Sequence, residues 1–178
     1  MFGECCPIVV PTVLMRASYV TPDANSLKQS LTANYVAETI LFNQVTVTDP
    51  SLSIDLATGE ITALKDFSGM ASLAATALRE QTGAGEMEWG VFIEGFDQVN
   101  GWQPYPGSLR PVTMSSQTTN EKRTIDYTIS VEISAGTKFR WRHYTSDASR
   151  QVSIVSFAAA NGLPSSAGAI VSFWGVKP

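Results

Sequence analysis

The most regular feature of the chain is a strict alternation of apolar and polar residues over 123–134. The apolar positions recur at every second residue: Ile125, Tyr127, Ile129, Val131 and Ile133. This period is typical of a strand with one buried face and one face in water. A turn at 135–137, which contains Gly136, leads into a second alternating run over 138–144. The pattern predicts an antiparallel hairpin.

Further short segments carry β-type patterns and are separated by Gly, Pro, Asn and Asp. We expect strands over 39–48, 52–56, 61–63, 67–79, 86–96, 109–116, 152–157 and 169–176. Residues 97–108 and 158–166 have the composition of loops. About eight to ten antiparallel strands with short turns close most naturally as an antiparallel jelly-roll sandwich. The sequence therefore predicts an all-β head domain over residues 38–178.

Residues 1–37 differ from the rest and are expected to form an extended N-terminal arm. Prolines at 7, 11 and 22 exclude a continuous helix there. The arm nevertheless contains an apolar set that needs a surface to cover it: Ile8, Val9, Val10, Val13 and Leu14. Two interpretations stay open: a loose arm folded over its own domain, and an anchor that docks into a neighbouring protein.

A short helix over 25–37 is the one helical element that the sequence indicates near this end. Asn25 or Ser26 can cap it. Leu27, Leu31 and Tyr35 then fall on one stripe at a spacing of four residues. Such a helix is too short to be stable alone, so it would need packing against neighbouring structure.

Composition narrows the functional classes. The 178 residues are 44% hydrophobic and 16% charged, with a formal net charge of −4. An acidic chain lacks the basic footprint of a nucleic-acid-binding protein, so no nucleic-acid partner is expected. No apolar run approaches the length of a membrane span, and the first residues do not resemble a signal peptide. We therefore expect no membrane insertion.

The two cysteines are adjacent, at Cys5 and Cys6. Neighbouring cysteines rarely bond to each other, because a disulfide requires a particular separation and dihedral angle. They are either reduced thiols in a protein made inside a cell, or they form a disulfide between chains of an oligomer. The pattern differs from that of a secreted protein held by internal disulfides.

Candidate catalytic residues are sparse. His143 is the single histidine and lies on the apolar side of its strand, which favours a satisfied, partly buried imidazole over a catalytic one. Glu86 and Glu88 would share one face of a strand, and paired carboxylates can hydrolyse glycosidic bonds, but a hydrated strand end also explains them. Metal-ligand and nucleotide-binding spacings are missing. We expect no catalytic residues, no metal and no cofactor.

The loop at 100–106 offers the best candidate contact residues. Trp102 and Tyr105 stand on a loop made rigid by proline and glycine, and rigid exposed rings lose little entropy on binding. The alternative is that both rings fold down over the end of the sandwich. Lys138, Arg140 and Arg142 form a basic stripe, which is either a solvent face or a contact for an acidic, glycan or subunit partner.

Three segments resemble those of a known fold family. The hairpin at 54–61 is similar to the opening hairpin of complement-type globular heads and tumour necrosis factor-like domains. The hairpin at 129–139 and the closing strand at 169–176 resemble elements of the same jelly rolls. Small domains of this kind behind a short arm also resemble bacteriophage virion proteins. The absent leader, the absent internal disulfide and the Ser-, Thr- and Ala-rich strands favour the virion class.

The resemblance implies a homotrimer with outward loops and no enzymatic activity. It suggests a phage fibre or spike head that attaches to a host surface glycan or protein, with residues 1–37 docked to other virion proteins. A capsid decoration or head-fibre protein that stabilises the shell is the alternative. A glycan-active enzyme is the third possibility. In each virion case the protein is made in the host cytoplasm and ends on the particle.

Overall fold

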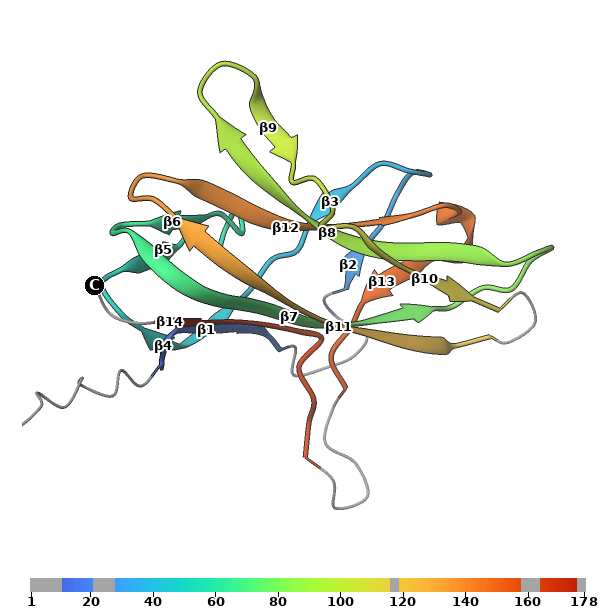
Figure 1. The fold of residues 1–178 in the computed structure, drawn as a ribbon. Coiled ribbons are helices and arrows are strands. Elements are labelled where there is room, and N and C mark those ends of the chain that lie inside the picture. The colour runs from blue at the N-terminus through green and yellow to red at the C-terminus, as the bar shows by residue number, and fades with distance from the viewer. Residues whose placement is uncertain (1–10, 21–27, 116–118, 158–163, 176–178) are drawn as a thin grey trace, which may run out of the picture.

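The computed structural model describes residues 11–20, 28–115, 119–157 and 164–175. Within these ranges the chain is almost entirely antiparallel β-structure, arranged as two seven-stranded sheets (Figure 1). The one helical element in the described ranges is the short 3-10 turn Ala148–Arg150. The expected all-β jelly-roll sandwich is confirmed.

Sheet A is built around its longest inner strand. It contains β1 (Thr12–Tyr19), β2 (Gln29–Ser30), β4 (Gln44–Thr48), β7 (Phe67–Arg79), β11 (Glu121–Ile133), β13 (Val152–Ile154) and β14 (Ala169–Gly175). One edge of β7 pairs with β11 along its whole length, and the other edge pairs with β14 and β13. Strand β1 joins β14 to β4. β11 therefore borders sheet A, and no other described strand pairs with it.

Sheet B faces sheet A across the core. It contains β3 (Glu38–Thr39), β5 (Leu52–Ile54), β6 (Ile61–Ala63), β8 (Met87–Asp97), β9 (Gly101–Pro104), β10 (Arg110–Met114) and β12 (Lys138–Thr145). β8 and β12 form its centre. The far edge of β8 is shared by β10 and β9, whereas β12 carries β6 and β3 on its other side.

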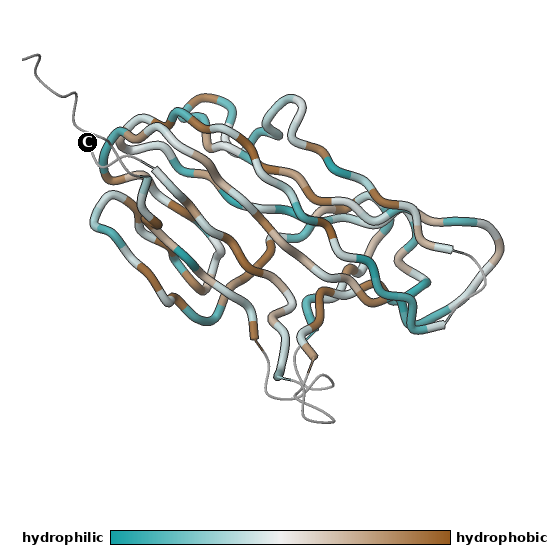
Figure 2. Tube along the Cα trace, turned by 60° about the horizontal axis from the view of Figure 1, so that its bottom comes forward, coloured by the Kyte–Doolittle hydropathy of each residue, from teal (hydrophilic) through white to brown (hydrophobic). Residues whose placement is uncertain are grey.

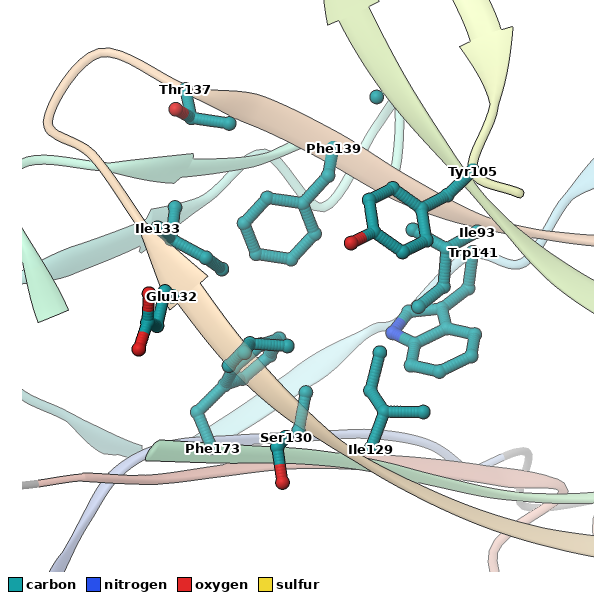
Figure 3. A pocket seen from close by; sticks show the side chains of 13 residues that line it. Ile93, Tyr105, Ile129, Ser130, Glu132, Ile133, Thr137, Phe139, Trp141 and Phe173 are labelled. Atoms are coloured by element: carbon teal, nitrogen blue, oxygen red, sulfur yellow. The ribbon is translucent and has the colours of Figure 1, made fainter. Parts of the chain in front are cut away.

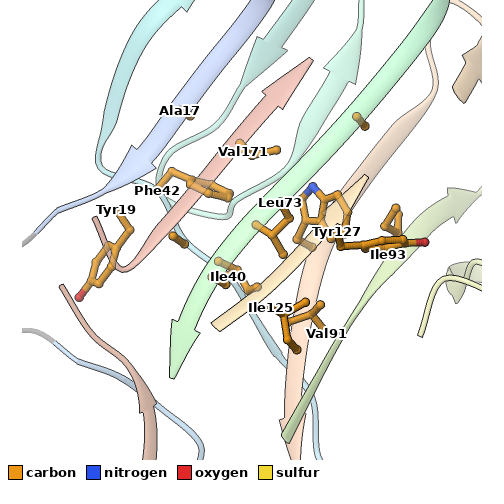
Figure 4. Packing of buried hydrophobic residues seen from close by; sticks show 14 of the residues in the cluster. Ala17, Tyr19, Ile40, Phe42, Leu73, Val91, Ile93, Ile125, Tyr127 and Val171 are labelled. Carbon is orange, nitrogen blue, oxygen red and sulfur yellow. The ribbon is translucent and has the colours of Figure 1, made fainter. Parts of the chain in front are cut away.

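The core is filled by the alternate residues that point inward from both sheets, as Figure 4 shows for Leu73, Val91 and Ile125. Figure 2 shows apolar and polar positions interleaved along the strands. The alanine-rich segment 67–79 is a strand because every second residue from Ala71 to Arg79 is buried. Gly69 permits the close pairing with β14, since a Cβ there would lie 2.0 Å from the Trp174 carbonyl oxygen.

The expected boundary between an arm at 1–37 and a head at 38–178 is wrong. β1 begins at Thr12 and pairs with both β14 and β4, so it is an integral strand of sheet A. Leu14 is fully buried in this domain's own core, and Val13 is half-buried beside it. Neither residue is therefore available as an anchor. Ile8, Val9 and Val10 lie outside the described residues.

The expected helix over 25–37 is also wrong in its described part, residues 28–37. Gln29–Ser30 is a short strand paired with β13, and Leu31 is buried at the end of this pairing. Tyr35 has a φ of 56°, a left-handed conformation that a helix excludes. The spacing of Leu31 and Tyr35 thus arises from a bent, extended segment laid against the sandwich.

Two strand boundaries differ from the expected ones for identifiable reasons. The segment 39–48 is divided, because the chain leaves β3 in sheet B and enters β4 in sheet A, with Ile40 and Phe42 buried during the crossing. Part of the expected loop 97–108 is strand β9, which folds back on β8.

Among the described residues, no helix is long and apolar enough to cross a membrane.

Candidate functional site

The β8–β9 hairpin extends beyond the body of the sandwich (Figure 1). Its turn is fixed by the carboxylate of Asp97, which accepts hydrogen bonds from the backbone N–H groups of Asn100 at 2.7 Å and Val99 at 2.8 Å. These bonds lower the pKa of Asp97. Gly101 closes the turn with a φ of 72°, which glycine adopts without strain. The projecting tip is therefore an ordered structure.

Tyr105 is more exposed than the other aromatic residues of this region that the structure describes. Its side chain is 62% exposed, yet its backbone is fixed, because its N–H donates to the Ile93 carbonyl at 2.8 Å. Its own carbonyl accepts from the Ser108 hydroxyl at 2.7 Å, and the backbone N–H of Ile93 in turn donates to that hydroxyl at 3.1 Å. Ser108 is buried. A free ring on a fixed backbone is well suited to contact a partner.

Trp102 is folded against sheet B, which is the alternative to an exposed ring that the sequence analysis left open. The guanidinium carbon of Arg140 lies 4.1 Å from the centre of the Trp102 ring, a cation–π contact. Phe96 meets the same ring edge-on at 5.4 Å between centroids. Phe96 is 45% exposed and Val99 is 89% exposed, so the hairpin carries apolar surface beyond the two rings that the sequence indicated.

The two arginines of the basic stripe on β12 share one carboxylate, and Lys138 Nζ lies 4.0 Å from Glu60. Arg140 donates through Nε to Glu94 at 2.8 Å, and Arg142 Nε lies 3.5 Å from the same carboxylate. Arg142 also donates to the Thr39 hydroxyl at 3.0 Å and to the Ala37 carbonyl. Burial lowers the pKa of Arg142, although Glu94 opposes this effect. Arg142 thus links β12 to β3 and β8 within sheet B, and Arg140 packs against the Trp102 ring.

Glu94 is the residue of this site that the sequence analysis missed. It is a mostly buried carboxylate that joins two guanidiniums beneath the hairpin. The available signal was its place in an apolar strand, where a lone charge requires a partner. Which strand would supply that partner depends on the pairing of β8 with β12, and that pairing is set by the tertiary fold.

The other expected positions do not come together as a catalytic group. His143 is fully buried, and burial lowers its pKa to about 3, so the ring is neutral at pH 7. Neither ring nitrogen has a hydrogen-bond partner within the described structure, so the expected satisfied, partly buried imidazole is wrong. Glu88 accepts a hydrogen bond from Tyr144, and burial, together with that bond, raises the pKa of Tyr144. Glu86 is exposed.

Metal-binding groups and the cysteines add no further site. In the described ranges, no three His, Cys, Asp or Glu residues are gathered as a metal centre would require. Cys5 and Cys6 fall outside the described residues. Across the part of the chain that the structure describes, the candidate site is therefore a contact surface, made by the β8–β9 hairpin, Tyr105 and their supports on β12.

The fold has counterparts among solved structures, although no family model matches the sequence and no curated protein does. The structure of Eiger TNF from S. frugiperda superimposes with a TM-score of 0.51 over 90% of this chain and 91% of that chain, at 8% identity. Murine APRIL superimposes with a TM-score of 0.50 over 92% and 98% of the two chains, at 10% identity. This chain therefore has a tumour necrosis factor-like jelly-roll fold.

Proposed function

We propose that this chain is a non-enzymatic, homotrimeric display head that binds a host-surface partner through the β8–β9 hairpin and Tyr105. The observation that carries the proposal is the combination of exposure and rigidity at Tyr105. Tyr105 is 62% exposed, while its backbone N–H donates to Ile93 of β8 and its carbonyl accepts from the buried Ser108 hydroxyl. Exposed aromatic anchors of this kind dominate the energy of many interfaces.

The supports beneath the hairpin favour the same role. The contact between Arg140 and Trp102 holds one side of the hairpin, and Glu94 holds Arg140. The exposed apolar surface of Phe96 and Val99 is thereby presented on a rigid frame. A preorganised surface loses less conformational entropy when it binds, which increases affinity without any additional contact.

The outer face of sheet A supports a homotrimer. Its central positions are small and uncharged, including Ser72, Ala74 and Ser172. Met70 is 46% exposed and Ile170 is 37% exposed on this face. A hollow at the border of this face is lined by Met70 and Trp174 and also by Glu132 and Tyr105. Charged residues border this centre, because Arg16 donates to the Ser172 hydroxyl and Asp126 of β11 pairs with Ala74. Interfaces between copies combine an apolar centre with a polar rim, and repeating the contact around a threefold axis closes a ring.

The virion setting of the proposal rests on the resemblance to small phage head domains and on the composition of the strands. In this setting, the segment before Thr12 attaches the head to the particle and the hairpin reaches the host. The alternative, a decoration protein that reinforces a capsid, has the same fold but needs no exposed contact ring. The two roles therefore differ in what happens when Tyr105 is removed.

The test measures adsorption of particles that carry Tyr105→Ala. We expect adsorption to host cells to fall by at least tenfold, because losing a central aromatic contact costs about 2 kcal/mol or more of binding free energy. Leu64→Ala is the matched control, since Leu64 is an apolar residue of similar exposure, 52%, on the turn between β6 and β7. Periodate or protease treatment of the cells distinguishes a glycan partner from a protein partner.

The outcomes separate the candidate functions. Unchanged adsorption with intact particles would contradict the attachment role. Unchanged adsorption with particles that break down on heating would favour the decoration role. Hydrolysis of a host glycan that Glu86→Gln and Glu88→Gln abolish would contradict the non-enzymatic assignment and favour the glycan-active enzyme.

A further inference from the structure

A cavity of about 160 Å³ lies between the two sheets, beside the border strand β11. Its walls are apolar and come from both sheets, as Figure 3 shows for Ile129 and Phe173 on one side and Phe139 and Ile93 on the other. The cavity exists here because β11 is paired only with β7 among the described strands. The C-terminal half of β11 therefore borders an opening in the sandwich.

Two polar groups face this space in Figure 3, the Tyr105 hydroxyl at the mouth and the Trp141 indole nitrogen at depth. Trp141 is completely buried, and its indole Nε1–H has no hydrogen-bond partner within the described structure. Trp141 lines the cavity, and Figure 3 shows its nitrogen on the side of the ring that faces the open space. Buried N–H groups are rarely left unpaired in proteins, because they lose their bonds to water without replacement. The unpaired donor therefore indicates that an acceptor atom belongs in the cavity.

The mouth of the cavity is formed by residues with polar groups. Tyr105 lies over one side of it, and Glu132 and Thr137 lie on the other (Figure 3). Glu132 is exposed and extends toward solvent at the rim. The charge therefore stays outside the apolar interior, and a molecule that enters meets carbon atoms on its sides and the Trp141 donor at depth.

We propose that this cavity binds a small, uncharged apolar molecule that carries one hydrogen-bond acceptor, such as a cyclic ketone. An apolar cavity of roughly 150 Å³ is large enough to hold a ring of benzene size. Ligand sites of this type combine apolar walls with a few polar groups that fix orientation. The Trp141 N–H supplies that orientation by donating to the ligand's oxygen. Tyr105 borders both this cavity and the proposed contact surface, whereas Trp141 belongs to the cavity alone.

The experiment uses the full-length protein labelled with ¹⁵N, whose four tryptophans give separate indole N–H signals. Cyclohexanone and methylcyclohexane are the probes, because both have a similar ring and only the first has an acceptor oxygen. We expect cyclohexanone to shift the Trp141 signal in a saturable manner and to bind more tightly than methylcyclohexane. Trp141→Phe assigns the signal and removes the donor while keeping an aromatic ring.

The variant series tests the donor and the cavity separately. A hydrogen bond of ordinary net strength corresponds to as much as about tenfold in affinity, so Trp141→Phe should weaken cyclohexanone by up to that factor. The same change should leave methylcyclohexane almost unaffected. Ala71→Leu fills the cavity from β7 and should abolish binding of both probes. Ala57→Leu is the matched control, because it makes the same change on the exposed turn between β5 and β6, and binding should persist.

Three results would overturn the proposal. The first is equal affinity for the two probes, and the second is binding that survives Ala71→Leu. The third is a wild-type Trp141 signal that neither probe shifts at millimolar concentration. Cyclohexanone must also bind to the protein in its oligomeric form. If binding occurred only after dissociation of an oligomer, a neighbouring copy would fill the cavity, which would contradict a free small molecule as the occupant.

Discussion

Replacing Glu94 by glutamine should destabilise the protein through the two arginines that it leaves behind. Glu94 is 9% exposed, and its carboxylate lies 2.8 Å from Arg140 Nε and 3.5 Å from Arg142 Nε. Glutamine has nearly the same shape and can still accept one hydrogen bond. The change therefore removes the negative charge and keeps the packing, so its effect reports the electrostatic role of Glu94 beneath the hairpin.

The size of the effect follows from burial. Removing one partner of a fully buried ion pair costs about 3–5 kcal/mol, whereas an exposed pair contributes at most about 1 kcal/mol. Counting side-chain atoms alone, Glu94 is 11% exposed, Arg140 18% and Arg142 16%, so the group is close to a fully buried ion pair. Solvent screening and the remaining hydrogen bond reduce the loss. We expect the free energy of unfolding to fall by about 2–3 kcal/mol.

Urea unfolding at one fixed protein concentration measures this loss, because the stability of an oligomer depends on concentration. Glu86→Gln is the control: it makes the same chemical change on an exposed residue one position before β8. Its cost should stay within about 0.5 kcal/mol. Equal effects of the two substitutions would refute the conclusion that Glu94 holds the arginines in place.

Two further predictions concern β1 and His143. Leu14→Ala should cost about 2–5 kcal/mol in urea unfolding, because Leu14 is fully buried in sheet A; a negligible cost would restore the anchor interpretation. Burial lowers the pKa of His143 from 6.5 to about 3, so the unfolded chain binds a proton that the folded chain excludes between those pH values. The free energy of unfolding should therefore decrease as the pH is lowered through this window, by up to about 1.4 kcal/mol per pH unit. His143→Leu should remove this component. An identical acid sensitivity in wild type and variant would contradict the buried, neutral imidazole.

The strands could be predicted because their signals are local. The alternation over 123–134 and the turn at Gly136 specify β11 and its hairpin without reference to other parts of the chain. Leu14 was misplaced because its apolar neighbours and flanking prolines describe a β-strand as well as they describe an arm. Only the partners of β1, in β4 and in β14 more than a hundred residues away, distinguish the two.

The candidate site could be predicted only as far as its signals are local. The loop composition around Trp102 and Tyr105 identified a rigid aromatic region, but the alternatives of exposed or folded rings were not resolved by sequence. The structure assigns one arrangement to each ring, because Arg140 covers Trp102 whereas Tyr105 is 62% exposed. Glu94 and the cavity beside Trp141 depend on which strands face each other across the sandwich, and local patterns carry no such information.

The native mass of the full-length protein, measured by light scattering with and without reductant, tests the display head most directly. The account predicts a mass near three times the chain mass of 19.2 kDa. A trimer that weakens in reductant would also place a disulfide between chains at Cys5 or Cys6. A stable monomer of 19.2 kDa in both conditions would contradict the trimeric head.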